Sequence, residues 1–401
     1  MLPFKKKKPA FISSIKQRIL KDELTKLRVK HDLWYQAFEK QERNKVWLDG
    51  KQYLMLSSND YLGLGFDLRV KEAAKEALDI WGTSPTGSRF ANGSRNYHKE
   101  LEEQIADFLG KESCHVHSAG YLSCVASVSC FVGKGDVALV DRNVHSSLWE
   151  GLKLSMATIE KFRHNNPASL EEELSFVGAD RKKMLVAEGV YSMEGHVAPL
   201  DQFVEIGQRH DCFIVVDDAH GFGVLGDQGR GTADYFGVTD SVDVISGSFS
   251  KSLASTGGFV AGDKEVIDYL RTYSKQTIFS AAINPTQAAI ASRALEIHLE
   301  EPEHLERLWS NTRRYHKFLE GIGLDYWESV TPATPIVAGS KERAYFFSER
   351  LKEKGVYANI IIPPGVPPGK ELVRTGMSAS FSDDDLDRLE AAITYAAKAL
   401  K

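Results

Sequence analysis

The middle of the chain alternates short apolar runs with segments of helix length. The runs are SCHVHS (113–118), DVALVD (136–141), KMLVAEG (183–189), FIVVDD (213–218), DVISGS (243–248) and GGFVAGD (257–263). Short apolar runs separated in this way are typical of a largely parallel sheet with helices on its faces. The pattern therefore predicts an α/β fold.

Charged and polar positions dominate on either side of this region. Residues 1–57 have a charged, helical pattern that ends in the strand-like KQYLMLSS, and long helical patterns follow from about residue 286. The closing SDDDLDRLEAAITYAAKALK begins with a helix N-cap at Ser382 and acidic residues in its first turn. We expect an N-terminal segment at 1–57, a large α/β domain at 58–285 and a smaller C-terminal α+β domain at 286–401.

The composition is that of an ordinary globular protein, with 401 residues of which 42% are hydrophobic and 26% charged. The net charge of −5 gives no sign of a nucleic-acid-binding surface, and no apolar stretch is long enough to span a membrane. The basic run Lys5–Lys8 suggests peripheral contact with the inner membrane surface or with an acidic carrier protein, although a solvated tail is the simpler explanation.

The cysteines lack metal-ligand spacing, which favours free thiols in a reducing cytoplasm; they are Cys114, Cys124, Cys130 and Cys212. Two further motifs have a weak functional interpretation. GFGVLG (221–226) matches a dinucleotide-binding pattern, but DDAH separates it from the preceding strand and no helix follows, which argues against NAD. His115 and His117 alternate on one strand without an evident third ligand, so we expect no metal site.

Chemically capable residues follow three of the apolar runs, at the strand ends where open α/β sheets place their sites. Gly120 and Tyr121 open a helix, whose backbone N–H groups favour an anion such as phosphate. Asp217 ends a buried strand, where a carboxylate requires a cationic partner. Lys251 follows the next strand among small residues, beside Ser248.

This combination fits pyridoxal 5′-phosphate (PLP). A lysine forms a Schiff base with the PLP aldehyde. An acid keeps the pyridine nitrogen protonated, which makes the ring an electron sink. Serine hydroxyls such as that of Ser248 bind phosphate oxygens, and small residues leave room for the ring beside Lys251.

Longer motifs give the chain a family resemblance. NDYLGL (59–64), GTSPTGSRFANGSRNYHKELEEQIADFLG (82–110), EGVYSMEGHVAPL (188–200), VVDDAHGFGVLGDQGRGT (215–232), GSFSKSLASTGGFVAG (247–262) and LVRTGMSASFSDDDLD (372–387) follow one another as in the α-oxoamine synthase family. The chain resembles that family over nearly its whole length. The likeness implies the fold-type I, aspartate aminotransferase-like architecture of PLP enzymes and a homodimer with shared active sites.

The resemblance implies a catalytic role for four residues. Lys251 would hold PLP covalently, and Asp217 would face the pyridine nitrogen. His220 would bind the O3′ atom of the ring. His145 would stack on the ring and steer the carboxylate of the amino acid.

Further residues would bind the cofactor or substrate, again by resemblance. The phosphate would be bound by the backbone at Gly120 and Tyr121 and by the side chains of Ser248 and, across a dimer interface, Ser280. Ser192 would lie near His220. Arg374 would bind the substrate carboxylate, and Asn59 would lie at the mouth of the site.

Some assignments have simpler alternatives. His145 lies in a polar loop that could be merely solvated, Glu188 could be a structural acid at a strand end, and Arg374 could pair with a surface acid. The sequence also departs from the family at two places. Ser248 stands where threonine is frequent, and Ile361–Ile362 stand where some relatives carry an arginine, which puts a second carboxylate-binding arginine in doubt.

The SMEG block, FSKSLAS and EPEHLERLWSNT are most similar to the bacterial branch that joins L-serine to a long-chain acyl thioester. The expected products are a 3-ketosphinganine-type aminoketone, CO2 and a free thiol, released from CoA or from an acyl carrier protein. Lys251 would remove the Cα proton.

Other functions stay open. SLWEG (147–151) and HNN (164–166) resemble quorum-sensing aminoketone synthases, and the 8-amino-7-oxononanoate synthase and glycine C-acetyltransferase types share the family. An aminotransferase has the same fold. A non-catalytic subunit would be expected to lack Lys251, and a regulator to carry a DNA-binding domain, of which residues 1–57 show no helix-turn-helix pattern.

Overall fold

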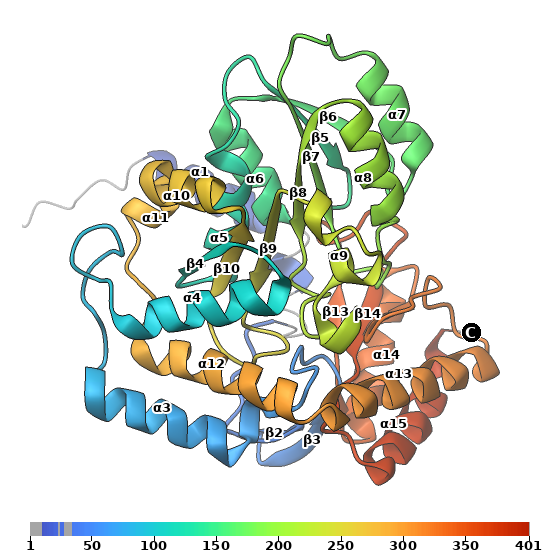
Figure 1. The fold of residues 1–401 in the computed structure, drawn as a ribbon. Coiled ribbons are helices and arrows are strands. Elements are labelled where there is room, and N and C mark those ends of the chain that lie inside the picture. Colours follow the sequence, from blue (N-terminus) through green and yellow to red (C-terminus); the bar gives the residue numbers. More distant parts are fainter. Residues whose placement is uncertain (1–9, 23–24, 28–33, 401) are drawn as a thin grey trace, which may run out of the picture.

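The computed structural model describes residues 10–22, 25–27 and 34–400 (Figure 1). At its centre lies a seven-stranded sheet with the order β4-β10-β9-β8-β7-β5-β6. Its strands are β4 (Ser113–His117), β5 (Val137–Asp141), β6 (Thr158–Phe162), β7 (Lys183–Glu188), β8 (Cys212–Asp217), β9 (Val244–Ser248) and β10 (Gly258–Gly262). The strands from β6 to β9 pair in parallel, whereas β10 is antiparallel to both β9 and β4.

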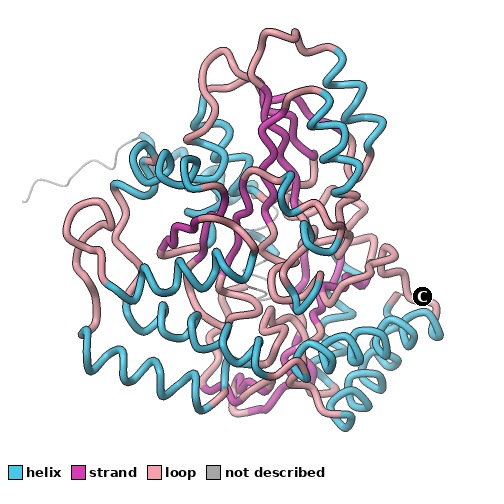
Figure 2. Tube along the Cα trace, in the orientation of Figure 1, coloured by secondary structure: helices cyan, strands magenta, loops and turns pink. Residues whose placement is uncertain are grey.

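All six predicted apolar runs are strands of this sheet, so the predicted α/β fold with a mostly parallel sheet is confirmed. Every residue of β5, β7, β9 and β10 is buried, as expected when helices cover both faces (Figure 2). The pattern missed β6, an edge strand in which only Phe162 is fully buried.

Helices surround the large sheet. They are α3 (Leu68–Trp81), α4 (Asn96–Leu109), α5 (Gly120–Ser129), α6 (Ser146–Ser155), α7 (Pro167–Ser175), α8 (Leu200–Arg209), α9 (Thr232–Tyr235), α10 (Lys264–Tyr273), α11 (Lys275–Ile278) and α12 (Pro285–Glu300). GFGVLG lies in turns between β8 and α9, not in a strand-turn-helix unit.

The remaining elements form a second region. A three-stranded sheet has the order β11 (Ala333–Val337), β14 (Leu372–Gly376), β13 (Asn359–Ile361), and its helices are α13 (Glu303–Ile322), α14 (Lys341–Glu353) and α15 (Asp383–Ala396). The predicted N-cap of α15 is confirmed, because the Ser382 hydroxyl accepts the Asp385 N–H at 3.2 Å and the Asp385 carboxylate accepts the Ser382 N–H at 3.2 Å.

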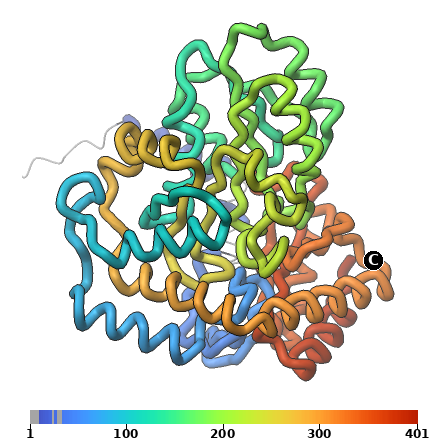
Figure 3. The backbone as a smooth tube through the Cα atoms, viewed as in Figure 1, coloured from blue at the N-terminus to red at the C-terminus, as the bar shows by residue number. Residues whose placement is uncertain are grey.

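The N-terminal strands belong to this second region. After α1 (Ala10–Lys21), the strands β1 (Lys40–Glu42), β2 (Lys45–Leu48) and β3 (Lys51–Met55) form a sheet with β12 (Val356–Tyr357). In Figure 3 the blue tube of the N-terminal strands lies beside the orange and red C-terminal part of the chain. Helix α12, which precedes the second region in the chain, packs against α3 and α4 of the predicted large domain. The three-part division of the chain stays a prediction.

Lys5–Lys8 lie outside the described residues. Within the described part of the chain, no helix combines the length and the hydropathy needed to cross a bilayer.

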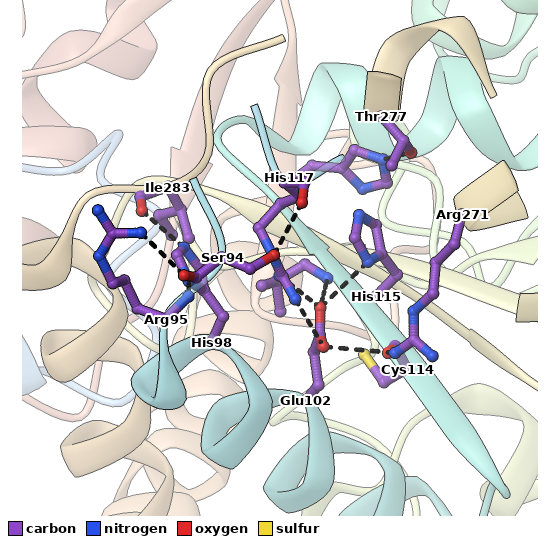
Figure 4. Close-up of polar contacts among 12 residues, drawn as sticks. Ser94, Arg95, His98, Glu102, Cys114, His115, His117, Arg271, Thr277 and Ile283 are labelled. Carbon is purple, nitrogen blue, oxygen red and sulfur yellow. Dashed lines mark hydrogen bonds and ion pairs between the residues drawn. The ribbon is translucent and has the colours of Figure 1, made fainter. Parts of the chain in front are cut away.

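Among the described residues no strand pairs with the outer edge of β4, and side chains bind its backbone instead (Figure 4). The N–H of Val116 donates to Glu102 Oε1 at 2.9 Å, and the carbonyl of Cys114 accepts from Arg271 Nη2 at 2.7 Å. Glu102 also accepts from Arg89 at 2.7 and 3.1 Å and from Arg271 at 3.3 Å. A buried carboxylate and two guanidinium groups thus replace the missing strand.

His115 and His117 belong to the same cluster. Nδ1 of His115 lies 3.1 Å from Glu102 Oε1, and His117 bonds to the hydroxyls of Thr277 at 3.0 Å and Ser123 at 3.3 Å. Burial lowers the pKa of both imidazoles, so both are neutral at neutral pH. Among the described residues, no group of three or more His, Cys, Asp and Glu side chains is placed to hold a metal ion.

We expect Glu102→Gln to lower the free energy of unfolding by about 3 kcal/mol, because it leaves the buried charge of Arg89 without its partner. Urea denaturation followed by circular dichroism measures the change. Glu301→Gln is the control, since the ion pair of Glu301 with Arg69 lies at the surface and is worth less than about 1 kcal/mol. Equal losses in the two variants would contradict the structural importance of the Glu102 cluster.

Candidate active site

The carboxyl ends of three neighbouring parallel strands bring the predicted catalytic residues together. Glu188 ends β7, Asp217 ends β8 and Ser248 ends β9, and Lys251 follows in the next turn. Glu188 and Asp217 are direct neighbours in the sheet register. The ammonium group of Lys251 makes no hydrogen bond or ion pair with the described residues. Burial lowers the pKa of its ammonium group, and the nearby charge of Asp217 opposes this shift.

Asp217 is a buried carboxylate with few donors. Its Oδ2 accepts from the Cys124 thiol at 2.9 Å and its Oδ1 from the Ala219 N–H at 3.1 Å. Burial and the charge of Asp217 raise the pKa of Cys124 well above its usual value, so the thiol keeps its proton. No basic side chain of the described region lies within ion-pair distance of Asp217. Such a carboxylate is costly unless a cation binds it, and a protonated pyridine nitrogen meets that need.

Glu188 is buried beside Asp217. Burial raises its pKa well above the usual value, and the adjacent Asp217 raises it further. Both effects favour the protonated form of Glu188. A Glu188 carboxyl oxygen accepts the backbone N–H of His145, so this acid also fixes the start of α6.

Asp218, the acid that follows Asp217 in the chain, faces away from the site. It accepts from the backbone N–H of Thr232 at 2.6 Å and from the Thr232 hydroxyl at 2.7 Å, and burial raises its pKa to about 6. Successive residues at a strand end point to opposite sides, which explains why one acid serves the site and the other holds a loop.

His220 is held in one tautomer. Its Nδ1 lies 2.7 Å from the hydroxyl of Tyr61, which is fully buried. Burial lowers the pKa of His220 and raises that of Tyr61, so the phenol donates to a neutral imidazole. The ring proton of His220 is then on Nε2, which can donate to a cofactor oxygen.

His145 is fixed, not merely solvated. It caps α6, and its Nδ1 bonds to the Ser147 hydroxyl at 2.7 Å and accepts the Ser147 N–H at 3.3 Å. The ring proton therefore lies on Nε2. His145 is partly exposed to solvent, and partial desolvation of its imidazole lowers its pKa.

Gly120 and Ser248 form a site for an anion. Gly120 begins α5, and a Cβ atom there would lie 2.5 Å from Ser248 Oγ, so only glycine permits this approach. The free backbone N–H groups of the first turn of α5 lie beside the Ser248 hydroxyl, which bonds to Ser250 at 2.8 Å. The side chain of Tyr121 is 48% exposed, so its contribution is the backbone N–H. These groups fit a phosphate.

Arg374 and Asn59 are the residues predicted to bind the substrate. Arg374 lies in the middle of β14, and its Nε donates to the carbonyl of Ser192 at 3.0 Å. No carboxylate of the described residues pairs with Arg374, and its charge acts on Lys251 and His220. The Oδ1 atom of Asn59 is buried without a hydrogen-bond partner, as expected for an atom that binds a ligand.

Ser280 follows α11, and no hydrogen bond or ion pair among the described residues joins it to the neighbours of Lys251. Its assignment across a dimer interface stays a prediction.

Sequence analysis missed two residues of the site. Tyr61 fixes the tautomer of His220, and Cys124 donates to Asp217. Cys124 lies one helical turn after Gly120, so the helix spacing could have placed it toward the strand ends. For Tyr61 the chain offers no local signal, because its partner is distant in the sequence.

A pocket of about 1490 Å³ opens beside His145 and Ser192. Its walls come from both regions of the chain. They include Trp149, His164 and His196 on one side and Trp327, Val366 and Lys370 on the other.

Known proteins share this arrangement of sequence and fold. The family model for aminotransferase class I and II matches residues 51–393. A serine palmitoyltransferase from Sphingobacterium spiritivorum is 40% identical over 354 residues, which cover 88% of this chain and 89% of that protein. An 8-amino-7-oxononanoate synthase from Symbiobacterium thermophilum is 37% identical over 360 residues, which cover 90% and 92%.

A solved structure extends the likeness to a bound cofactor. A serine palmitoyltransferase from S. paucimobilis with a bound PLP–myriocin aldimine has a TM-score of 0.91 and 29% identity, and the match covers 98% of both chains. The expected fold-type I architecture is therefore confirmed. On this coverage, the chain belongs to the aminotransferase class I and II family and, as its motifs predicted, to the α-oxoamine synthases within it.

Proposed function

We propose that the chain uses PLP to condense L-serine with a long-chain acyl thioester, with loss of CO2 and release of the thiol, to give a 3-ketosphinganine-type aminoketone. The observation that carries this proposal is the buried Asp217 carboxylate, without a cationic partner in the described region, beside Lys251 and the Gly120–Ser248 anion site. The serine palmitoyltransferase relatives support serine as the amino acid.

PLP supplies an electron sink that stabilises negative charge at the substrate Cα. Lys251 holds the cofactor and then acts as the base, for which burial and a lowered pKa favour the neutral amine. Asp217 accepts the N–H of the pyridine ring. Nε2 of His220 donates to the ring oxygen.

Two cationic or donor groups orient the amino acid. Arg374 would bind its carboxylate, and the Nε2–H of His145 would donate to the same group and so fix the orientation of the amino acid. The unpartnered Oδ1 of Asn59 accepts from the substrate. The pocket beside His145 takes the acyl thioester, since tryptophan and proline side chains give it apolar walls.

The proposal includes three partners. The first is a second copy of the chain, which supplies Ser280 to the phosphate. The second is acyl-CoA or an acyl carrier protein, and the third is the inner membrane surface, contacted from the cytoplasm by Lys5–Lys8.

Asp217→Asn should slow exchange of the serine Cα proton by at least about 100-fold per bound cofactor, because an amide cannot keep the pyridine nitrogen protonated. Proton NMR of L-serine in D2O measures this exchange. Asp218→Asn is the matched control, since its carboxylate faces Thr232: it should lower stability and leave exchange within about threefold. Exchange at the wild-type rate in Asp217→Asn would remove the assigned role.

The reaction itself is tested with a panel of L-serine, glycine and L-alanine against acetyl-, octanoyl- and palmitoyl-CoA. Thiol and CO2 release should be fastest for L-serine with palmitoyl-CoA. A preference for glycine or alanine would assign the chain to another α-oxoamine synthase type. Amino-group transfer to a keto acid without thiol release would indicate an aminotransferase.

A further inference from the structure

One wall of the large pocket has an unusual backbone. Trp327 and Glu328, which both line the pocket, have positive φ angles of 53° and 54°. Side chains with a Cβ atom rarely adopt this left-handed conformation, and two in succession need support from their surroundings. Strained backbone of this kind is frequent at ligand sites and persists only where neighbouring groups hold it in place.

A chain of polar groups ends at this turn. Nε2 of His196 donates to the carbonyl of Trp327 at 2.7 Å, and Nδ1 of His196 lies 3.1 Å from Nε2 of His164. Nδ1 of His164 lies 3.1 and 3.2 Å from the two carboxylate oxygens of Asp141. The two imidazole rings are nearly parallel, with centroids 5.3 Å apart and an interplanar angle of 18°.

The other end of the chain is anchored in the large sheet. Asp141 ends β5, is fully buried, and accepts the backbone N–H groups of Asn143 and Asn165 at 2.8 Å each. A carbonyl oxygen only accepts, so the donors run from His196 to Trp327, from His164 to His196 and from His164 to Asp141. The polar contacts therefore run without a break from Asp141 at the end of β5 to the turn at Trp327.

The chain touches the pocket but not the groups that bind the amino acid. His164, His196 and Trp327 all line the pocket. Arg374 bonds to Ser192 and His145 bonds to Ser147 and Glu188, and none of these contacts involves the three residues. No hydrogen bond of the described structure therefore joins His164, His196 or Trp327 to Arg374 or His145.

We propose that His164 and His196 are positioning residues for the acyl-thioester pocket. They transmit the fixed position of Asp141 to Trp327, whose indole is the apolar wall against which the acyl thioester packs. This inference rests on the proposed function for the identity of the ligand. It assigns to these residues the affinity for the acyl donor and not that for the amino acid.

The test compares His196→Phe, which removes the bond to Trp327, with His196→Gln, whose amide nitrogen can donate to the same carbonyl. His210→Phe is the control, because His210 pairs with Glu171 far from the pocket. The holoenzyme gives the KM for the acyl-CoA that the wild type uses best and the dissociation constant for its preferred amino acid, read from the cofactor absorbance. Hydrogen exchange of residues 325–330 without substrates reports on the turn.

His196→Phe should raise the KM for acyl-CoA about tenfold, leave the amino-acid dissociation constant within about twofold, and speed exchange at the turn. His196→Gln should restore all three values to near those of the wild type, and His210→Phe should match the wild type.

An unchanged KM, an equal loss of amino-acid affinity, or a glutamine variant that behaves like the phenylalanine variant would overturn the inference. If the proposed function fails, the wild type prefers another amino acid or another acyl-CoA. The KM values and dissociation constants of the variants are then compared with those of the wild type on the substrates that it prefers.

Discussion

The buried carboxylate of Asp217 is the constraint on which the site depends. In the described structure it has only a thiol and one backbone N–H as donors, and burial raises the pKa of its neighbour Glu188 well above the usual value. Burial of an unpaired carboxylate opposes folding unless a ligand offsets it. In the proposed function a cationic ring nitrogen offsets this charge, and the ammonium group of Lys251 has no partner in the described region.

The parallel sheet supplies the geometry for this arrangement. Because β7, β8 and β9 run in the same direction, their carboxyl ends lie at one edge, where the acids, the Gly120–Ser248 anion site and Lys251 converge. Gly120 follows β4 and Ser248 ends β9, so their contact depends on the positions of β4 and of β10, which lies between these strands. The Glu102 cluster binds the outer edge of β4. The second region adds Arg374 and the outer wall of the pocket.

The sequence predicts what depends on local pattern. Six strands follow from their apolar runs, and Asp217, Lys251 and Gly120 follow from the rule that sites lie at strand ends. The cap at Ser382 follows from a local motif. The sequence does not predict contacts between distant segments. These are the contacts of Tyr61 with His220, Cys124 with Asp217, Glu102 with the edge of β4, and His196 with Trp327. β6 was missed because its sequence TIEKF carries two charged residues and buries only Phe162, so it has no continuous apolar run.

The proposed function requires that PLP binds covalently to Lys251, at the carboxyl ends of β7, β8 and β9. Borohydride reduction of the PLP-loaded protein followed by peptide mapping tests it most directly. Lys111 and Lys183 are also buried, but both bond to backbone carbonyls, so neither is expected to react. The account predicts the pyridoxyl label on the peptide that contains Lys251. A label on Lys111, Lys183 or any other lysine would contradict it.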